Sequence, residues 1–162
     1  MQIDIAKVNI RNIGPDDIPE LVRHRIEYLI ELQGQRDRSY IEKLSLELTN
    51  FFNTSLLNGS FTGLIAHINH RILAYGAILI KNVPGDMNST KYREADIFNM
   101  YTIPDARKNG ISKMILNGLI EIAKDLKIAK LALHTSADGE KIYRSFGFSE
   151  PGFPYLELVT GI

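Results

Sequence analysis

One helical pattern, flanked on both sides by strand patterns, constrains the fold of this chain more than any other feature. From Ile111 to Leu126 the apolar residues return at helical spacing and form one continuous face. Residues 95–103 before this helix and residues 130–135 after it have the composition of strands, and Pro104 ends the first of them. Such a strand–helix–strand unit predicts two parallel strands joined by a helical crossover.

The other patterns predict a sheet that is built mainly from hairpins. Further strands are expected over residues 5–11, 61–68, 71–80 and 155–159, and a polar loop over residues 82–93. Further helices are expected from the turn at residues 14–17 to Gly34, from the Ser39–Glu42 capping box to Asn58, and over residues 137–146. This order predicts a single α/β domain over residues 1–162, of the α+β kind. Its central sheet is mixed and mostly antiparallel, with helices on both faces.

Charge and composition exclude several classes of function. The 19 basic and 19 acidic side chains cancel, so broad attraction to nucleic acid or to an anionic membrane is not expected. No apolar run approaches the roughly 20 residues of a membrane span, and the first residues lack the apolar core of a secretion signal. The sequence has no cysteine, which excludes disulfides, thiolate metal sites and a thiol nucleophile. We therefore expect a cytoplasmic protein without a nucleic-acid or membrane partner.

The segment Ala-Arg-Lys-Asn-Gly-Ile-Ser at residues 106–112 has the composition of an anion-binding loop. A helix that begins near Gly110 presents unpaired N–H groups and the positive end of its dipole to a phosphate. Gly110 allows close approach of a ligand, Arg107 and Lys108 can add charge-assisted contacts, and Ser112 is small. A basic, solvated helix start is the alternative, and this segment alone does not decide between the two.

Residues 99–112 resemble the acetyl-CoA motif of the GNAT superfamily, the GCN5-related N-acetyltransferases. The family signature, Gln/Arg-x-x-Gly-x-Gly/Ala, follows a strand, and here Arg107, Gly110 and Ser112 take its three positions. Ser112 departs from the usual glycine or alanine. Residues 137–148 resemble the second marker of the family, a helix that carries a tyrosine and closes in Gly-Phe. The two markers occur in the family's order and on the expected elements.

The resemblance implies an N-acetyltransferase that moves an acetyl group from acetyl-CoA directly to a primary amine of a small molecule or peptide, through a ternary complex. The missing cysteine agrees, because no thiol-based acyl-enzyme can form. One alternative is a non-catalytic CoA-binding sensor or regulatory module with the same fold. Another is a purely structural domain, against which Arg107, Gly110 and Tyr143 together argue. The oligomeric state is open, although homodimers are common in the superfamily.

The resemblance also implies where acetyl-CoA binds. The pantetheine arm would pair like an extra strand with the backbone of Met100, Tyr101 and Thr102, and the pyrophosphate would lie on the backbone of residues 108–112. The complete set of expected acetyl-CoA contacts is Met100, Tyr101, Thr102, Arg107, Lys108, Asn109, Gly110, Ile111, Ser112, Ser136 and Tyr143.

Three residues are expected at the catalytic centre: Tyr143, Met100 and Asn99. Tyr143 is the expected general acid, because a phenol with a pKa of about 10 stays protonated beside a thiolate whose pKa is about 8.5. Packing in the core is the alternative for its ring. The Met100 N–H would polarise the thioester carbonyl. Asn99 stands where many members of the family place a glutamate base, and an amide is not a useful base at neutral pH.

The sequence leaves the general base and the acceptor site open. The candidate bases are Glu94 and Asp96 in the strand and Glu27 and Glu31 in the first helix, although each is otherwise an ordinary surface carboxylate. Glu27 and Glu31 share a helix face, and in this superfamily the first two helices usually line the acceptor pocket. Substrate binding is therefore assigned to Glu27 and Glu31.

No metal site is expected, because the histidines lack a suitable arrangement of further ligands. His67 and His70 belong to a hairpin and do not share a face. His134 is expected to end a buried strand near the cofactor groove. Ser136 and Asp138 either reach the cofactor or cap the last helix, and capping is the expectation for Asp138.

Overall fold

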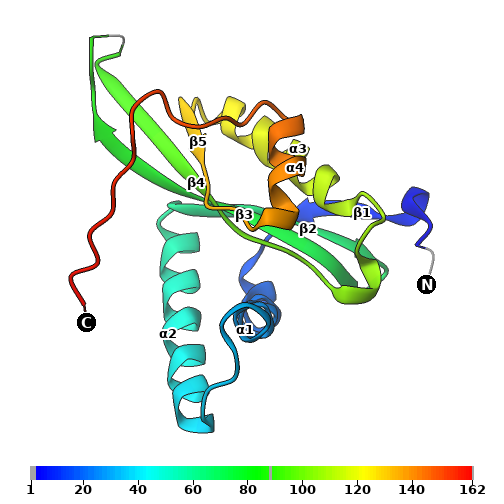
Figure 1. The fold of residues 1–162 in the computed structure, drawn as a ribbon. Coiled ribbons are helices and arrows are strands. Elements are labelled where there is room, and N and C mark those ends of the chain that lie inside the picture. Colours follow the sequence, from blue (N-terminus) through cyan, green and yellow to red (C-terminus); the bar gives the residue numbers. More distant parts are fainter. Residues whose placement is uncertain (1–2, 88, 162) are drawn as a thin grey trace.

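The computed structural model describes residues 3–87 and 89–161, which form a five-stranded sheet with helices on both faces (Figure 1). The strands are β1 (Asn9–Asn12), β2 (Phe61–Ile68), β3 (Arg71–Pro84), β4 (Lys91–Thr102) and β5 (Lys130–Ala132). The α-helices are α1 (Ile18–Gln33), α2 (Arg38–Leu57), α3 (Ile111–Asp125) and α4 (Ala137–Ser145). Single turns of 3-10 helix span Ile5–Lys7, Pro15–Asp17 and Pro104–Ala106.

The strands lie in the order β1-β2-β3-β4-β5, and every neighbouring pair is antiparallel except the last. β5 runs parallel to β4, with Glu94 opposite Lys130 and Asp96 opposite Ala132. A parallel pair requires a crossover, and α3 provides it. The predicted fold class, a mixed and mostly antiparallel sheet with helices on both faces, is therefore confirmed.

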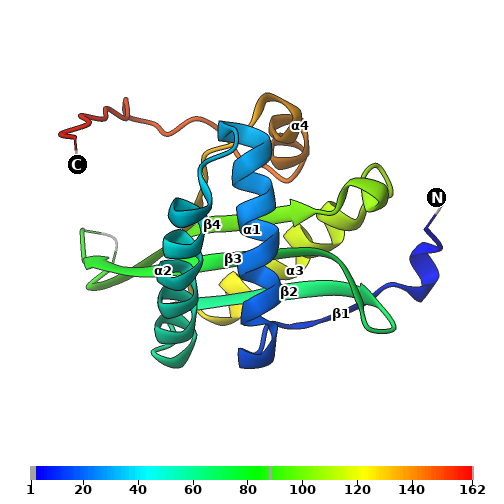
Figure 2. The same cartoon turned by 90° about the horizontal axis from the view of Figure 1, so that it is seen from below.

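α1 and α2 cover one face of the sheet, while α3 and α4 lie on the other (Figures 1 and 2). One buried cluster joins Leu21 of α1 and Phe52 of α2 to Tyr75 of β3. A second cluster packs α3 against the opposite face, where Leu73 and Ile78 of β3 contribute. The middle of β3 is consequently buried on both faces, which explains its continuous apolar run.

The predicted amphipathic helix forms α3 and lies tightly on the sheet. Ile111, Ile115 and Leu119 are each at most 1% exposed. At Gly118 a Cβ atom would lie 2.3 Å from Cδ1 of Leu64 in β2. Glycine at this position therefore allows the helix to approach the sheet more closely than alanine would.

The predicted capping box of the second helix is wrong. α2 begins at Arg38, and its N-cap is Asp37, whose carboxylate accepts a hydrogen bond from the Tyr40 N–H at 2.8 Å. Ser39 lies inside the helix and donates its hydroxyl to Asp37. Glu42 pairs with Arg38 instead of returning to the cap. A carboxylate at the N-cap accepts a backbone N–H and also complements the helix dipole.

Two predictions for the strands of the front half are corrected. Residues 5–7 form a 3-10 turn rather than a strand, because the Asp4 side chain caps that turn by accepting the Ala6 N–H. Only the middle of residues 82–93 is a loop: β3 continues to Pro84, β4 begins at Lys91, and the two strands pair there as a long hairpin. Residue 88, within this segment, lies outside the described residues.

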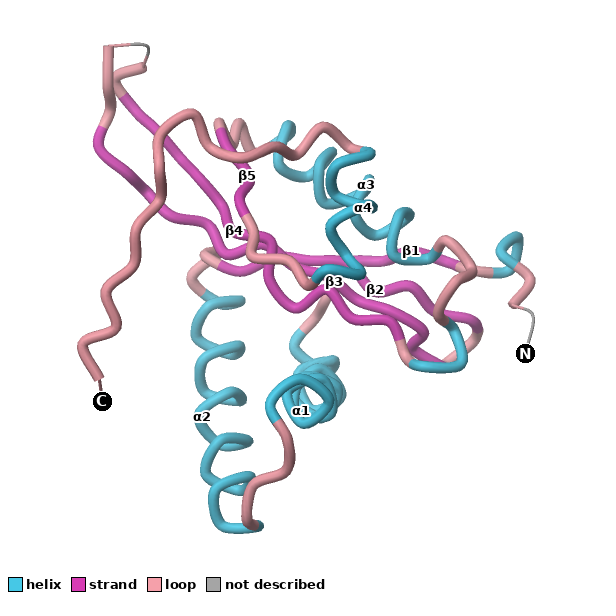
Figure 3. The backbone as a smooth tube through the Cα atoms, in the orientation of Figure 1, coloured by secondary structure: helices cyan, strands magenta, loops and turns pink. Residues whose placement is uncertain are grey.

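The predictions for the end of the chain also differ from the structure. β5 stops at Ala132 and is at most half-buried, so the predicted buried strand over residues 130–135 is too long. Residues 155–159 form no strand and follow an extended path (Figure 3). Tyr155 and Glu157 contact His134 beyond the end of β5, with ring centroids 6.2 Å apart for Tyr155 and an N–O distance of 3.9 Å for Glu157. The side chains of residues 155–159 are exposed, which removes the burial that the strand prediction assumed.

Candidate active site

β4 and β5 separate after three paired positions and leave one edge of β4 open. β5 pairs with residues 94–96 only. Beyond these, and within the described part of the chain, the pairing of β4 is with β3 alone. Such an edge presents unpaired backbone N–H and C=O groups. Met100, Tyr101 and Thr102, the residues predicted to bind the pantetheine arm, lie on this open segment.

β4 is bulged at the predicted catalytic centre. The register with β3 shifts between Tyr75 and Ala77, so that Asn99 and Met100 together lie opposite Gly76. Asn99 has φ of 56°, in the left-handed region that asparagine tolerates better than most residues. A Cβ atom on Gly76 would lie 2.3 Å from Sδ of Met100. The Met100 side chain thus packs over Gly76, and its backbone remains the part that can face a ligand.

The segment between β4 and α3 turns through left-handed conformations, with φ of 64° at Lys108 and 81° at Gly110. The Asn109 side-chain amide holds this turn by donating to the carbonyls of Ala106 at 3.2 Å and Arg107 at 2.9 Å. Asn109 therefore shapes the loop from inside. The exposed Lys108 has no ion-pair partner among residues 3–87 and 89–161, so its charge remains available.

Gly110 is the N-cap of α3 and supplies no side-chain hydrogen bond. The first N–H groups of a helix have no intrahelical acceptor, so those of Ile111 and Ser112 can serve a bound anion. The Ile111 side chain is buried and anchors the helix start, while Ser112 is half-buried. A Cβ atom on Gly110 would meet nothing within 4 Å, which shows that the space above the loop is open.

Arg107 points toward α1 and not toward the helix start. Its Nε donates to the Thr102 carbonyl at 2.9 Å, and its Nη2 contacts the two carboxylate oxygens of Glu31 at 3.1 and 2.9 Å. Its guanidinium also lies 5.7 Å from the centroid of the Tyr101 ring. Arg107 thus ties the loop to β4 and to α1, and a direct phosphate contact would require it to leave Glu31.

Tyr143 lies half-buried on α4, with its ring edge-on to Phe148 at a centroid distance of 5.8 Å. Burial raises the pKa of Tyr143 to about 12, and the phenol of Tyr28 acts in the same direction. The hydroxyl therefore stays protonated at neutral pH, as a proton donor must.

Ser136 is the N-cap of α4, and its Oγ accepts a hydrogen bond from the Gly139 N–H at 3.3 Å. Asp138 lies in the first turn, so the prediction that Asp138 caps the helix is wrong. Its charge still complements the helix dipole. Because the Ser136 hydroxyl already serves the cap, contact with acetyl-CoA would have to share it.

All four carboxylates considered as bases are engaged in ion pairs. Measured from nitrogen to oxygen, the pairs are Arg23–Glu27 at 2.5 Å, Arg107–Glu31 at 2.9 Å, Lys130–Glu94 at 2.7 Å and Lys81–Asp96 at 2.8 Å. Asp96 lies four residues before Met100, about 13 Å along the strand, and Glu94 lies farther away. Direct proton transfer from an amine near Met100 to Asp96 or Glu94 would have to bridge that distance.

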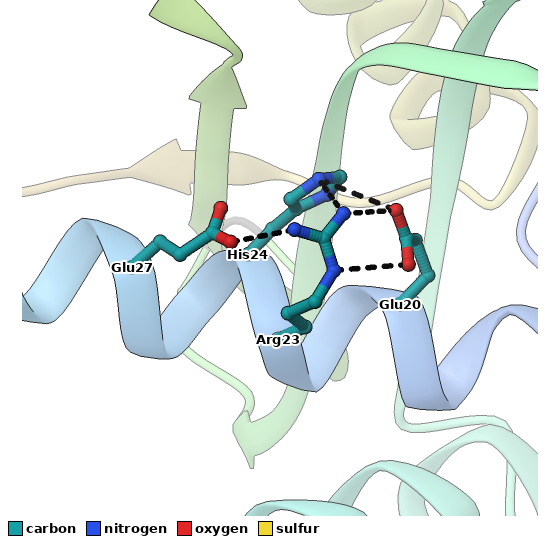
Figure 4. A network of polar contacts seen from close by, with 4 residues as sticks. All are labelled: Glu20, Arg23, His24 and Glu27. Carbon is teal, nitrogen blue, oxygen red and sulfur yellow. Dashed lines mark hydrogen bonds and ion pairs between the residues drawn. The ribbon is translucent and has the colours of Figure 1, made fainter.

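α1 carries a polar network that the sequence patterns do not reveal (Figure 4). Arg23 donates to Glu20 and Glu27, and its Nη2 lies 2.9 Å from Nε2 of His24. His24 is 2% exposed and stacks on Tyr75 at 5.7 Å. Burial and the charge of Arg23 lower the pKa of His24. Because arginine only donates, Nε2 must accept, and the ring is neutral.

Asn99 is brought to α1 as well. Its side chain is 7% exposed, and its Oδ1 accepts a hydrogen bond from Nη1 of Arg25. Sequence patterns gave Arg25 no role, because a charged residue on a helix is normally solvated. Only the distant contact with β4 shows that this guanidinium is half-buried at the bulge.

Of the remaining histidines, His67 and His70 belong to the β2–β3 hairpin. His67 contacts the Asn69 carbonyl at 2.7 Å. His134 is exposed and follows β5, which corrects the expectation of a buried position. Within residues 3–87 and 89–161, no three histidine or acidic side chains are grouped as metal ligands would be. Among the described helices, none has the length and apolar character required to cross a bilayer.

Comparison with known proteins identifies the family. Residues 20–148 match the model of the acetyltransferase (GNAT) family. A crystal structure of a predicted acetyltransferase with acetyl-CoA, from Clostridium acetobutylicum, is 34% identical. It superposes with a TM-score of 0.82 over 94% of this chain and 96% of that chain. The chain belongs to the GNAT acetyltransferase family and is an acyltransferase enzyme.

A second structure extends the likeness in fold. A GCN5-related N-acetyltransferase from Ralstonia eutropha JMP134 superposes with a TM-score of 0.78 at 22% identity, covering 95% of this chain and 99% of that chain. None of the curated proteins matches the sequence.

Proposed function

We propose that this protein transfers the acetyl group of acetyl-CoA directly to a primary amine of a small molecule or peptide. The observation that carries the proposal is the short segment between β4 and α3. It joins the open edge of β4 to the start of α3, where the N-cap Gly110 supplies no side-chain hydrogen bond. A strand edge suits the amide-bearing pantetheine arm, and a helix start suits the pyrophosphate. Family membership and the relative crystallised with acetyl-CoA support the same donor.

In this proposal the backbone of residues 100–102 pairs with the pantetheine arm, and the backbone of residues 108–112 holds the pyrophosphate. The residues present fit such a ligand, because Gly110 leaves open space and the exposed Lys108 adds charge. Arg107 supports the loop through its contact with Glu31. No metal takes part.

The transfer itself requires three actions from the protein. The amine nitrogen attacks the thioester carbonyl carbon, a C–N bond forms, and the C–S bond breaks with its electron pair on sulfur. The Met100 N–H donates to the carbonyl oxygen as negative charge develops there. Tyr143 gives its proton to the leaving thiolate. Glu27 or Glu31, directly or through water, takes the proton of the acceptor, and the Asn99 amide does not.

The test is the release of free thiol from acetyl-CoA with a panel of primary amines: polyamines, aminoglycosides, amino acids and peptide N-termini. We expect thiol release that depends on the amine and equals the acetylated product formed. CoA binding by calorimetry without turnover of any amine would instead favour a CoA-binding sensor. Asn99, in the place of a carboxylate, is the observation that keeps this alternative in view.

The proposal extends to the whole chain. We assign residues 1–162 to a single acetyltransferase domain that acts in the cytoplasm, without a nucleic-acid or membrane partner. The cancelling charges of the sequence support the absence of a nucleic-acid or membrane partner.

A further inference from the structure

Arg25 is a half-buried cation without an anionic partner. Six other arginines each pair with a carboxylate: Arg11, Arg23, Arg38, Arg71, Arg107 and Arg144. Among the described residues, Arg25 forms no such pair. It donates Nη1 to the neutral Oδ1 of Asn99, and its guanidinium carbon lies 4.2 Å from the centroid of the Phe98 ring. Its Nε is buried and has no hydrogen-bond acceptor. A cation removed from water without a counter-ion is unfavourable.

Three further buried groups near Arg25 also lack partners. Two are Nδ2 of Asn99 and the hydroxyl of Tyr75, whose residues are 7% and 1% exposed. The third is Nδ1 of His24, whose ring stacks on Tyr75. Asn99 contacts Arg25 directly, and Tyr75 directly precedes Gly76, which lies opposite Asn99 in the β3–β4 pair. Burial raises the pKa of Tyr75, so its hydroxyl remains a donor. Native interiors leave few such groups unpaired. Three unpaired donors around one positive charge match an anion that accepts hydrogen bonds.

We propose that Arg25, Asn99 and Tyr75 bind the carboxylate of the acceptor, and that the acceptor is an amino acid or a similarly short amine with a carboxylate. The inference rests on the proposed function and specifies its substrate class. The two oxygens of a carboxylate match the guanidinium fork. A cationic polyamine would be repelled by the same charge.

The position of the cluster on β4 determines the length of the acceptor. Asn99 directly precedes Met100, whose N–H is proposed to hold the acetyl carbonyl, and consecutive Cα atoms lie about 3.8 Å apart. A carboxylate bound at Asn99 therefore lies close to the transferred acetyl group. An α-amino acid, in which a single carbon separates amine and carboxylate, fits this spacing better than an acceptor with a remote anion.

The experiment compares each L-amino acid with its own carboxamide, which keeps the amine and the side chain but removes the charge. We expect the protein to acetylate the preferred acid with a kcat/KM about 10- to 100-fold above that of the amide. Arg25→Met should lower kcat/KM for the acid by a similar factor and change that for the amide little. Arg36→Met, at an exposed arginine beside Tyr40, serves as the control and should leave both unchanged.

A further variant and a binding measurement distinguish a failure of this inference from a failure of the proposed function. Arg25→Lys retains the charge but not the fork, so an intermediate loss is expected even if Arg25→Met folds poorly. Calorimetric binding of acid and amide to the CoA-loaded protein gives the same comparison if no amine is turned over. Equal use or equal binding of acid and amide overturns the inference while amine acetylation stands. Preference for phosphoethanolamine over every amino acid overturns the assignment to a carboxylate.

Discussion

Tyr143 combines a half-buried phenol with a position on α4, the helix that follows the opening between β4 and β5. A thiolate leaving group has a pKa of about 8.5 in water, well below the value that burial gives this phenol. The phenol therefore holds its proton more tightly than a free thiol does, and it can assist by sharing that proton with the sulfur as negative charge develops there and the C–S bond breaks. The Phe148 contact fixes the ring, so the hydroxyl can be removed without removing the packing.

Replacement of Tyr143 by phenylalanine tests the role as general acid. We expect Tyr143→Phe to lower kcat about 100-fold while the Kd for CoA stays nearly constant, because the ring remains and only the proton donor is lost. Thiol release measures kcat, and calorimetry measures Kd. Tyr40→Phe, at a side chain that is 53% exposed on α2, is the matched control. An unchanged rate would remove Tyr143 from the mechanism.

The raised pKa of Tyr143 also predicts a dependence of stability on pH. The folded protein keeps this proton up to a pKa of about 12, whereas the unfolded chain releases it near pH 10. The stability that the neutral phenol contributes is present below about pH 10 and is lost as the pH rises through the folded pKa. Between about pH 8 and pH 11, the wild-type Tm should therefore fall more than that of Tyr143→Phe. Parallel losses in thermal melts would contradict this account.

A comparison of valine variants at Gly110 and Gly34 separates the effect of backbone strain from the effect on ligand binding. The φ values of the two glycines are 81° and 86°, and a Cβ atom on either would meet nothing within 4 Å. Valine at Gly110, where ψ is 0°, should cost about 1–2 kcal/mol of stability. Valine at Gly34, where ψ is 170°, should cost at least as much, because that region is almost restricted to glycine. Only Gly110→Val should also weaken CoA binding, by roughly tenfold or more, which is at least 1.4 kcal/mol. Calorimetry and thermal melts measure the two effects, and retained binding in Gly110→Val would contradict the loop assignment.

Among the elements, α2 depends on a cap that the sequence pattern assigned to the wrong residue. Asp37→Ala removes the acceptor of the Tyr40 N–H and should cost about 1 kcal/mol. For a chain of this length that corresponds to a fall in Tm of about 2–4 °C. Ser39→Ala should change Tm much less, because its hydroxyl only donates to Asp37. Equal losses in the two variants, measured by circular dichroism, would restore Ser39 to the cap.

Elements whose burial follows a regular period could be predicted, and the others could not. α3 carries apolar residues at helical spacing, and β2 and β3 carry nearly continuous apolar runs, so their patterns report their positions. The ends of β3 and β4 extend past the core and are mostly polar. Backbone pairing between residues such as Asn82 and Arg93 holds them together, so no apolar pattern marks them as strands. Residues 155–159 show the reverse case. Their composition suits a strand, but no strand of the described sheet pairs with them.

The residues of the candidate site also fall into those that a local pattern predicts and those that it does not. The loop at residues 106–112 and the tyrosine of α4 follow local sequence order, so a motif can locate them. Arg25 and Asn99 are 74 positions apart in the sequence and meet only in the folded chain. The apolar periodicity of α1 does not show which residue of a distant strand Arg25 contacts. Arg25 and His24 could therefore be assigned a role only after α1 was placed against β4.

For the molecule as a whole, the unusual feature is the apolar tail, defined as residues 153–159. Its large side chains are exposed: Phe153 87%, Leu156 88%, Leu158 87%, Val159 88%, and Tyr155, whose ring lies beside His134, 69%. Exposed apolar segments of this kind mark association sites in soluble proteins. β5 is the last strand of the described sheet, so one of its edges is free to accept another strand. A second copy supplies both complementary parts, which favours a homodimer.

We expect light scattering to give the wild-type chain a mass near twice 18.3 kDa. A variant with serine at Phe153, Leu156 and Leu158 should have the monomer mass, because it loses the apolar area that drives association. Leu57→Ser, at a side chain that is 91% exposed on α2, is the control for the loss of one exposed apolar group and should remain dimeric. A wild-type chain that stays monomeric at high concentration would contradict the homodimer. A tail variant as dimeric as the wild type would move the interface away from residues 153–159.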